Sequence, residues 1–349
     1  MATNCTLFAD RQHYCTVIYA VKQTICSLEL IGSIFIIFII WLFKKYKYFD
    51  QRLILALGIA ALGESICLML TDVPQQRGHF CRFQAWLVTY FVLAVLAWVC
   101  CITFNIWKAL RGDRAKRLEK YYHIISWSVP FVVACLPLIG DSYGPAGPWC
   151  WVAGDVEYSA IWRFATYYIP LFLCIIAILV ANIYIFVKYR QRAKRWEGVH
   201  GRNNTAEDEQ RKRVMNSLLA YPCIYLVLSL GPLAYRIHNA VSPKPSFVLI
   251  LVHVISIPLT GLANAIAFGL NKDTLRRLNW ADLKAAFQQH LPLKANAKAA
   301  SPMGVHKLGE PTCTVIDIHQ DANVNAFQYG NQAMVESSQN GFQLSVESN

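Results

Sequence analysis

Residues Phe83 to Leu110 read FQAWLVTYFVLAVLAWVCCITFNIWKAL, a run in which Lys108 is the only charged side chain. A helix rises about 1.5 Å per residue, so this run is long enough to cross the roughly 30 Å hydrocarbon core of a bilayer. A run of this length and composition is typical of a transmembrane helix and not of a helix in a soluble domain.

Six further apolar runs occur along the chain. The seven predicted spans are Thr24–Phe43, Leu53–Leu70, Phe83–Leu110, Tyr121–Ile139, Phe164–Val187, Val214–Tyr235 and Phe247–Leu270. None alternates with period two, which argues against a β-barrel. Of the 349 residues, 55% are hydrophobic and only 15% are charged, against roughly a quarter charged in soluble domains. The sequence therefore predicts an all-α membrane protein built as a bundle of seven transmembrane helices.

The distribution of Lys and Arg predicts the orientation of the bundle. The segments after the first, third and fifth spans are basic, and the segments between them are poor in Lys and Arg. The positive-inside rule places the basic segments in the cytoplasm, with the N-terminus extracellular and the C-terminus cytoplasmic. We therefore interpret the net charge of +12 as a topology signal, not as a nucleic-acid-binding surface, and expect a plasma-membrane location.

Three parts follow from the pattern: an extracellular segment 1–23, the bundle with a membrane-surface helix 24–289, and a disordered cytoplasmic tail 290–349. The surface helix is predicted over Asp273–Gln289, where apolar side chains recur on one face. No cleavable signal peptide is visible. Asn4 begins an Asn-Cys-Thr sequon on the predicted outer side, so we expect it to be glycosylated.

Of the twelve cysteines, most lie within spans and are interpreted as small apolar filler. Cys81 and Cys150 lie instead at the outer end of span three and in the loop after span four. Both face an oxidising compartment, so we predict a disulfide between them. For Cys5 and Cys15, the sequence leaves pairing and free thiols equally open.

Several local motifs, taken together and in order, carry a family resemblance. They are Trp127-Ser128-Val129-Pro130, Trp149-Cys150-Trp151-Val152, Tyr168-Ile169-Pro170-Leu171, Tyr189-Arg190, Gly261-Leu262-Ala263-Asn264-Ala265 and Phe268-Gly269. With these motifs, residues 24 to 289 resemble the cyclic-AMP-receptor-like group of G-protein-coupled receptors. The Trp-Cys-Trp motif is also similar to secretin-like and adhesion receptors. The rhodopsin-like class fits worse, because span three lacks Asp-Arg-Tyr and span seven lacks Asn-Pro-x-x-Tyr.

The resemblance implies a cell-surface receptor that binds a small extracellular ligand and activates a heterotrimeric G protein. Polar side chains in the outer halves of spans are the candidate ligand contacts, because burying a polar group in a membrane costs free energy and is typical of functional sites. They are Glu64, Tyr90 and His253, joined at the outer rim by Arg163 and Arg236. The alternative is structural: Glu64 is paired or protonated, and the rim cations extend to the interface. The cations would suit a phosphate, but the ligand stays unidentified.

Basic residues at the inner face are the candidate G-protein contacts, since the C-terminus of a G-protein helix is negative. They are Arg111, Arg114, Lys116, Arg117, Arg190, Arg192, Arg211, Lys212 and Arg213. Pro222 suits a hinge in span six, although an ordinary kink is the alternative. Serines of the tail are candidate sites for a receptor kinase and arrestin.

Other classes of seven-span protein fit less well. A retinal protein needs a lysine within span seven, and none occurs there. A transporter usually shows matching broken helices in two halves, and no internal repeat is visible. The nine histidines are scattered, so we expect no metal, no cofactor and no enzymatic activity. A transporter or channel remains the alternative to a receptor.

Overall fold

The computed structural model describes residues 8, 11–70, 78–111, 115–146, 149–154, 156–199, 206–241 and 245–290. In these ranges, seven helices are long and apolar enough to span a membrane. They are α1 (Gln12–Leu42), α2 (Phe49–Met69), α3 (His79–Arg111), α4 (Glu119–Ile139), α6 (Ile169–Val199), α7 (Ala206–Val241) and α8 (Phe247–Gly269). A short helix α5 (Ser159–Arg163) and a π-helical turn η5 (Phe164–Tyr168) lead directly into α6. The predicted seven-helix bundle is therefore confirmed.

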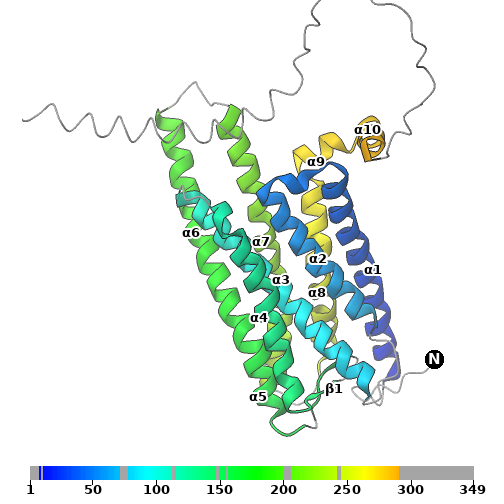
Figure 1. Cartoon of the computed structure of the whole chain (residues 1–349). Coiled ribbons are helices and arrows are strands. Elements are labelled where there is room, and N and C mark those ends of the chain that lie inside the picture. The colour runs from blue at the N-terminus through cyan, green and yellow to red at the C-terminus, as the bar shows by residue number, and fades with distance from the viewer. Residues whose placement is uncertain are drawn as a thin grey trace, which may run out of the picture. The chain divides into compact units, whose positions relative to one another are not determined.

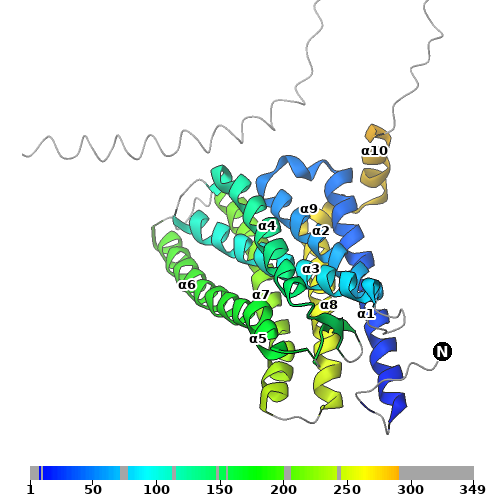
Figure 2. The same cartoon turned by 60° about the horizontal axis from the view of Figure 1, so that its bottom comes forward.

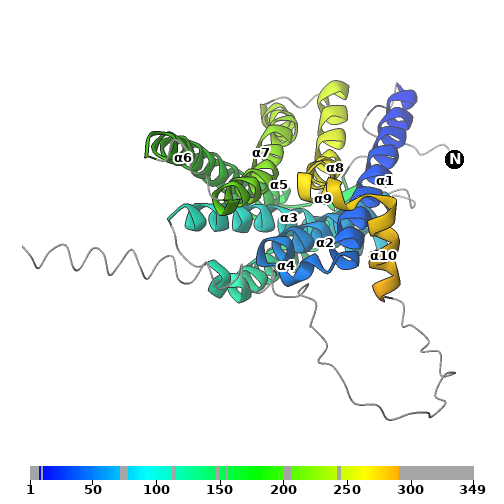
Figure 3. The same ribbon diagram turned by 90° about the horizontal axis from the view of Figure 1, so that it is seen from above.

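Helix α3 lies at the centre of the bundle, as the view along the bundle axis shows (Figure 3). It packs against α2, α4, α6 and α7, while α1 packs on α2 and α8. Its inward side chains form the middle of the core, where Trp98, Ile102 and Ile106 are fully buried. The start of α1 and the loop between α4 and α5 lie at one end of the bundle, and the helices after α8 lie at the other (Figure 1).

The outward faces of the helices are apolar. Ile31, Ile124, Leu173 and Ile183 are each more than half exposed, at 63%, 59%, 63% and 57%. In a soluble protein, so many exposed aliphatic side chains would form an aggregating surface. In hydrocarbon they are in their preferred solvent, and the helices satisfy their own backbone groups. The exposed faces therefore agree with a multi-pass membrane protein.

Helix α1 begins at Gln12, well before the predicted start at Thr24. The extra turns were missed because they carry polar residues and fall outside the apolar run. Their inward positions Cys15, Ile18 and Lys22 recur every three or four residues and are buried. Ile18 packs in a cluster with residues of α7 and α8, so tertiary contacts extend this helix beyond the hydrocarbon-length run.

The continuous segment from α5 to α6 and the helix α7 also extend past the predicted spans, because their added turns carry polar and charged residues and fall outside the apolar runs. The loop between α4 and α5 contains two short strands, β1 (Tyr143–Pro145) and β2 (Cys150–Val152), which the all-α prediction did not include. They pair antiparallel, with Gly144 opposite Trp151. A two-stranded ribbon of this size needs outside support, which α3 supplies by packing against both strands.

The predicted surface helix over Asp273–Gln289 is divided into α9 (Lys272–Arg277) and α10 (Trp280–His290). The first ends where Leu278 N–H donates to the carbonyls of Thr274 and Leu275, and the second starts from the carbonyl of Asn279. Asparagine favours helix ends over interiors, which explains the break. Helix α10 turns away from α9 beside the C-terminal end of α1 (Figure 2). There, His290 Nε2 donates to the Leu42 carbonyl at 2.9 Å.

Candidate functional site

The hairpin β1–β2 covers the end of the bundle where α1 begins. Cys81 at the start of α3 is bonded to Cys150 of β2, which confirms the predicted disulfide. Tyr143 of β1 donates from its hydroxyl to the Ala134 carbonyl of α4 at 2.8 Å. The covalent bond and this hydrogen bond fix the hairpin to two helices. Cys15 is also disulfide-bonded, to a partner outside the described residues, where Cys5 and Asn4 also lie.

Beneath the hairpin, Arg236 of α7 is surrounded by aromatic rings. Its guanidinium carbon lies 4.8 Å from the ring centroid of Trp151, 5.2 Å from that of Tyr168 and 5.0 Å from that of Tyr235. Such distances allow cation–π attraction with each ring. Nη1 donates to the Tyr168 hydroxyl at 3.2 Å, and Nη2 lies 3.3 Å from His253 Nε2. Since a guanidinium only donates, His253 Nε2 is the acceptor in this pair.

Arg236 is only 8% exposed, yet no ion pair with a carboxylate is found for it in the described part of the chain. A second cation, Arg163, lies nearby and contacts the same Trp151 ring. Arg163 donates to the Val152 carbonyl of β2 at 2.7 Å, with its guanidinium carbon 5.6 Å from the Trp151 ring centroid. Buried charges are normally paired. Among the described residues, Arg236 and Arg163 therefore lie close together without a carboxylate paired to Arg236.

A cavity of about 60 Å³ adjoins these groups and is lined by Lys22, Trp149, Trp151, Arg236 and His253, among others. Lys22 was assigned from sequence to the extracellular segment. The longer α1 brings it into the bundle. Trp149 and Trp151 belong to the motif that carried the family resemblance, but no role was assigned to them. We refer to this space and its lining as the cationic chamber.

Glu64 lines a second cavity of about 40 Å³ with Tyr225, Ser229, Ser256 and Thr260. The two cavities share Tyr167 in their linings, so they adjoin in the interior of the bundle. Each has room for a few water molecules, whereas pockets for small organic ligands measure roughly 300–1,000 Å³. A ligand of that size requires the chamber to open.

The structure brings together four of the five predicted ligand contacts around these cavities. Glu64, Arg236 and His253 line them, and Arg163 holds the hairpin above them. Tyr90 lies elsewhere. Its ring contacts those of Trp86, Phe91, Trp127 and Phe131 on the α4 side of α3. We therefore do not retain Tyr90 as a candidate ligand contact.

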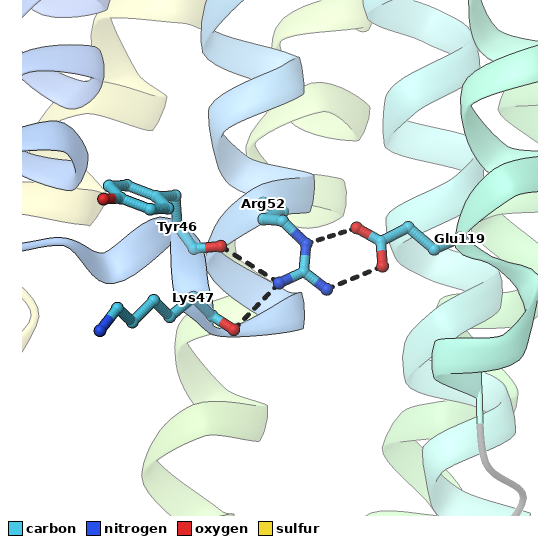
Figure 4. Close-up of polar contacts among 4 residues, drawn as sticks. All are labelled: Tyr46, Lys47, Arg52 and Glu119. Atoms are coloured by element: carbon cyan, nitrogen blue, oxygen red, sulfur yellow. Dashed lines mark hydrogen bonds and ion pairs between the residues drawn. The ribbon is translucent and has the colours of Figure 1, made fainter.

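The opposite end of the bundle contains a second polar cluster, centred on Arg52 of α2 (Figure 4). Arg52 forms a two-bonded ion pair with Glu119 at the start of α4, of which the Nη2–Oε2 distance is 2.7 Å. Its Nη1 donates to the carbonyls of Tyr46 and Lys47 in the preceding turn η2 (Lys45–Lys47). One guanidinium thus joins the α1–α2 turn to α4.

Lys45 in the same turn connects it to α9. Its Nζ donates to Thr274 Oγ1 at 2.9 Å, although the side chain is only 8% exposed. Burial, with help from the nearby Arg277 guanidinium, lowers the pKa of Lys45 to about 8, while Asp273 acts in the opposite direction. Directly after this turn, Asp50 in the first turn of α2 accepts a hydrogen bond at its Oδ1 from Asn105 Nδ2 of α3 at 3.3 Å. The α1–α2 turn is therefore anchored on several sides.

Among the predicted G-protein contacts, Arg111, Arg117 and Arg190 are exposed. Arg111 and Arg190 lie over the rings of Trp107 and Phe186. Arg114 lies outside the described residues, as do the side chains of Lys116, Arg192, Arg211, Lys212 and Arg213. Pro222 is buried within α7, which continues through it. Its role as a hinge stays a prediction.

Comparison with known proteins identifies relatives over most of the chain. The profile of a family described as slime mold cyclic AMP receptor matches residues 10–293. G-protein coupled receptor 1 of Arabidopsis thaliana is 26% identical over 267 residues, 76% of this chain and 81% of that protein. Cyclic AMP receptor-like protein A of Dictyostelium discoideum is 25% identical over 252 residues, 70% of this chain but only 62% of that protein. G-protein coupled receptor 157 of Rattus norvegicus is 25% identical over 271 residues, 72% and 81% of the two chains.

Proposed function

The chain belongs to the slime mold cyclic AMP receptor family, and from this premise we propose that it is a cell-surface G-protein-coupled receptor for a small anionic ligand. The cationic chamber would receive the ligand from outside the cell. The inner ends of the helices would activate a heterotrimeric G protein. This assignment uses the orientation predicted from Lys and Arg, with the N-terminus extracellular and the C-terminus cytoplasmic.

One observation carries the choice of ligand class: the buried Arg236 lacks a carboxylate partner among the described residues and faces a cavity. A carboxylate or phosphate there would accept charge-assisted hydrogen bonds from the guanidinium. Its Nε has no protein acceptor in the described structure, so a donor is available. The aromatic rings would exclude water and strengthen this pairing. Several relatives are named cyclic AMP receptors, which makes cyclic AMP one anion to test.

Ligand access would require the hairpin to move, because the chamber holds only a few waters in the described conformation. The disulfide between Cys81 and Cys150 holds the hairpin at Cys150, so only the parts of the hairpin away from Cys150 could move. Arg163 is placed to respond, since it holds β2 through the Val152 carbonyl next to Arg236. An anion that draws Arg163 toward it would release β2. In this way, ligand charge would be coupled to the hairpin.

At the inner end, the exposed Arg111, Arg117 and Arg190 form a surface suited to the negative C-terminus of a G-protein helix. Replacing Arg111 and Arg117 together by Ala would weaken G-protein activation at equal surface expression. Receptor kinases and arrestins are further proposed partners at the tail, which lies outside the described residues.

The test is stimulated nucleotide exchange on purified G proteins by receptor in nanodiscs, with cyclic AMP and a panel of small phosphates and carboxylates. Arg236→Gln should reduce agonist potency at least tenfold, as expected for a lost charge-assisted hydrogen bond. Tyr90→Phe is the matched control and should respond as the wild type does. An agonist that acts equally on Arg236→Gln and the wild type would refute the chamber as its site.

A further inference from the structure

The junction of α1, α2 and α8 contains buried oxygen atoms with no protein donor. Glu29 of α1 is fully buried, and neither of its carboxyl oxygens has a hydrogen-bond partner in the described structure. Ser33 Oγ and Asn264 Oδ1 are likewise buried and unpartnered there. Buried polar atoms without partners are rare in folded proteins, and each calls for an explanation, which is often a water or an ion.

Helix packing places these atoms within about one helical turn of each other along α1 and α8. A Cβ added to Gly261 of α8 would lie 2.2 Å from Glu29 Oε1, so the carboxyl rests directly on the α8 backbone. About one turn further along both helices, a Cβ added to Gly32 of α1 would lie 2.8 Å from Ala265 Cβ of α8. Ser33 follows Glu29 by four residues on α1, and Asn264 follows Gly261 by three on α8. Residues at these spacings share a helix face, so both point to the same junction.

Glu64 of α2 supplies a second carboxyl. It is 4% exposed and interacts electrostatically with Glu29. Gly58 of α2 lies against Ile36 of α1. Because the two helices are antiparallel, Glu64, six residues after Gly58, lies at about the depth of Glu29, seven residues before Ile36. Two neighbouring carboxyls inside a bundle cannot both ionise without a cation. No Lys or Arg is found in an ion pair with either of them in the described ranges.

Ser33 differs from other hydroxyls buried in the spans. Thr89, Thr103 and Thr260 each donate to the carbonyl four residues earlier in their own helix, which is the usual way to satisfy a hydroxyl in a transmembrane helix. Ser33 makes no such bond. Its oxygen is therefore free to act as a ligand, as are the Asn264 and Glu29 oxygens.

We propose that Glu29, Ser33, Glu64 and Asn264 form a sodium site between α1, α2 and α8. The donors are all oxygens, which hard cations prefer. A monovalent ion fits the charge, because one Na⁺ and one retained proton neutralise the two carboxyls. A Ca²⁺ ion usually takes six to eight oxygen ligands, so it would need every oxygen of this set and would leave no carboxyl protonated. Glu64 also lines the second cavity, which shares Tyr167 with the cationic chamber, so an ion would reach the site from this side of the bundle.

The experiment measures the thermal stability of the purified full-length protein in NaCl, KCl and N-methylglucamine chloride at one pH and one ionic strength. A ligand that binds only the folded state stabilises it by mass action. Saturating Na⁺ should therefore raise Tm by about 2–4 °C over the other two cations. Equal Tm values in the three salts would overturn the proposal, because carboxyls that are merely protonated respond to none of them selectively.

Two variants locate the site. Ser33→Ala should raise the half-saturating Na⁺ concentration about tenfold by removing one ligand. Ser27→Ala is the matched control: it lies on the same helix, and its hydroxyl is satisfied by the Gln23 carbonyl. Glu29→Gln should abolish the Na⁺-dependent shift. If Ser33→Ala and Ser27→Ala keep the wild-type Na⁺ dependence, the site is refuted, even where Glu29→Gln fails to fold. None of these measurements uses an agonist or a G protein, so the result is independent of the proposed receptor function.

Discussion

Helix α1 lies close to α8 at Gly32, and we predict that adding one methyl group there destabilises the bundle. A Cβ at Gly32 would lie 2.8 Å from Ala265 Cβ and 3.8 Å from Leu262 Cα. Carbon atoms pack at about 3.5–4.0 Å, so Gly32→Ala forces the helices apart by roughly 1 Å. The obstructing atom is attached to the backbone, so no rotamer change relieves the clash. In a membrane, close packing is a main source of helix association.

The size of the effect follows from two opposing contributions. Overpacking a close contact costs about 1–3 kcal/mol, while Gly to Ala in a helix interior contributes up to about 1 kcal/mol in the opposite direction. Gly58→Ala on α2 is the matched control, because its Cβ would meet Ile36 Cγ2 at 3.4 Å, an ordinary contact. Gly58→Ala should therefore keep the helix contribution without the clash. The two variants should differ by about 2 kcal/mol, and in opposite directions from the wild type.

The assay is thermal unfolding of the detergent-purified protein, followed by size-exclusion chromatography after heating. Each kcal/mol corresponds to about 2–4 °C in Tm for a domain of about 200 residues, so the variants should be separated by about 4–8 °C. Gly32→Ala should lie below the wild type, and Gly58→Ala at or above it. A Gly32→Ala protein as stable as Gly58→Ala would show that α1 and α8 do not approach as closely as described.

Three further predictions concern the ends of the bundle. Removing the disulfide by Cys81→Ser or Cys150→Ser should lower the free energy of unfolding by about 4 kcal/mol, given the sequence separation of 69 residues. The yield of folded protein should be no lower for the double variant than for either single variant. The pKa of Lys45 is lowered to about 8 in the folded state, below its unfolded value of about 10.4. Between about pH 8 and pH 10.4 the folded state therefore binds fewer protons than the unfolded state, and the free energy of unfolding should rise with pH. Tm measured against pH should show this rise in the wild type relative to Lys45→Met, and parallel curves would contradict it. Arg52→Gln should cost about 1–2 kcal/mol by breaking the ion pair with Glu119, and a double-mutant cycle with Glu119→Gln should give a coupling of at least about 0.5 kcal/mol.

The spans and the disulfide were predictable because their signals are local or one-dimensional. The run Phe83–Leu110 lies within α3, and Phe247–Leu270 differs from α8 by one residue. Cys81 and Cys150 were singled out because both were predicted to lie on the same, oxidising side of the membrane. The start of α1 was not predictable in this way. It is helical because Ile18 packs against α7 and α8, a contact that hydropathy does not report.

The composition of the site was partly predictable, and its geometry was not. Depth along a helix follows from residue count, so Glu64 and His253 were correctly placed within the bundle. The rotation of a helix about its axis does not follow from residue count, because an error of one residue turns a side chain by about 100°. On α3, Val88, Thr89 and Val92 face the chamber, while Tyr90 contacts Phe131 on another side. The aromatic surroundings of Arg236 depend on a loop fold that the all-α prediction lacked.

The charges of the interior are arranged in a way that stability alone does not explain. Arg236 and Glu64 line adjoining cavities, with opposite charges available for pairing. A buried ion pair with good geometry would offset part of the desolvation cost of both groups. Instead, Tyr167 lines both cavities, Arg236 is held by rings and His253, and Glu64 is left with Glu29. Sites that bind a charged partner leave a complementary charge unpaired until the partner arrives, and the stability lost in the free protein is recovered on binding. Separated charges of opposite sign at two depths are therefore what an anion site and a cation site in one bundle require. Because Tyr167 borders both, a ligand that moves this ring would change the surroundings of the second site as well.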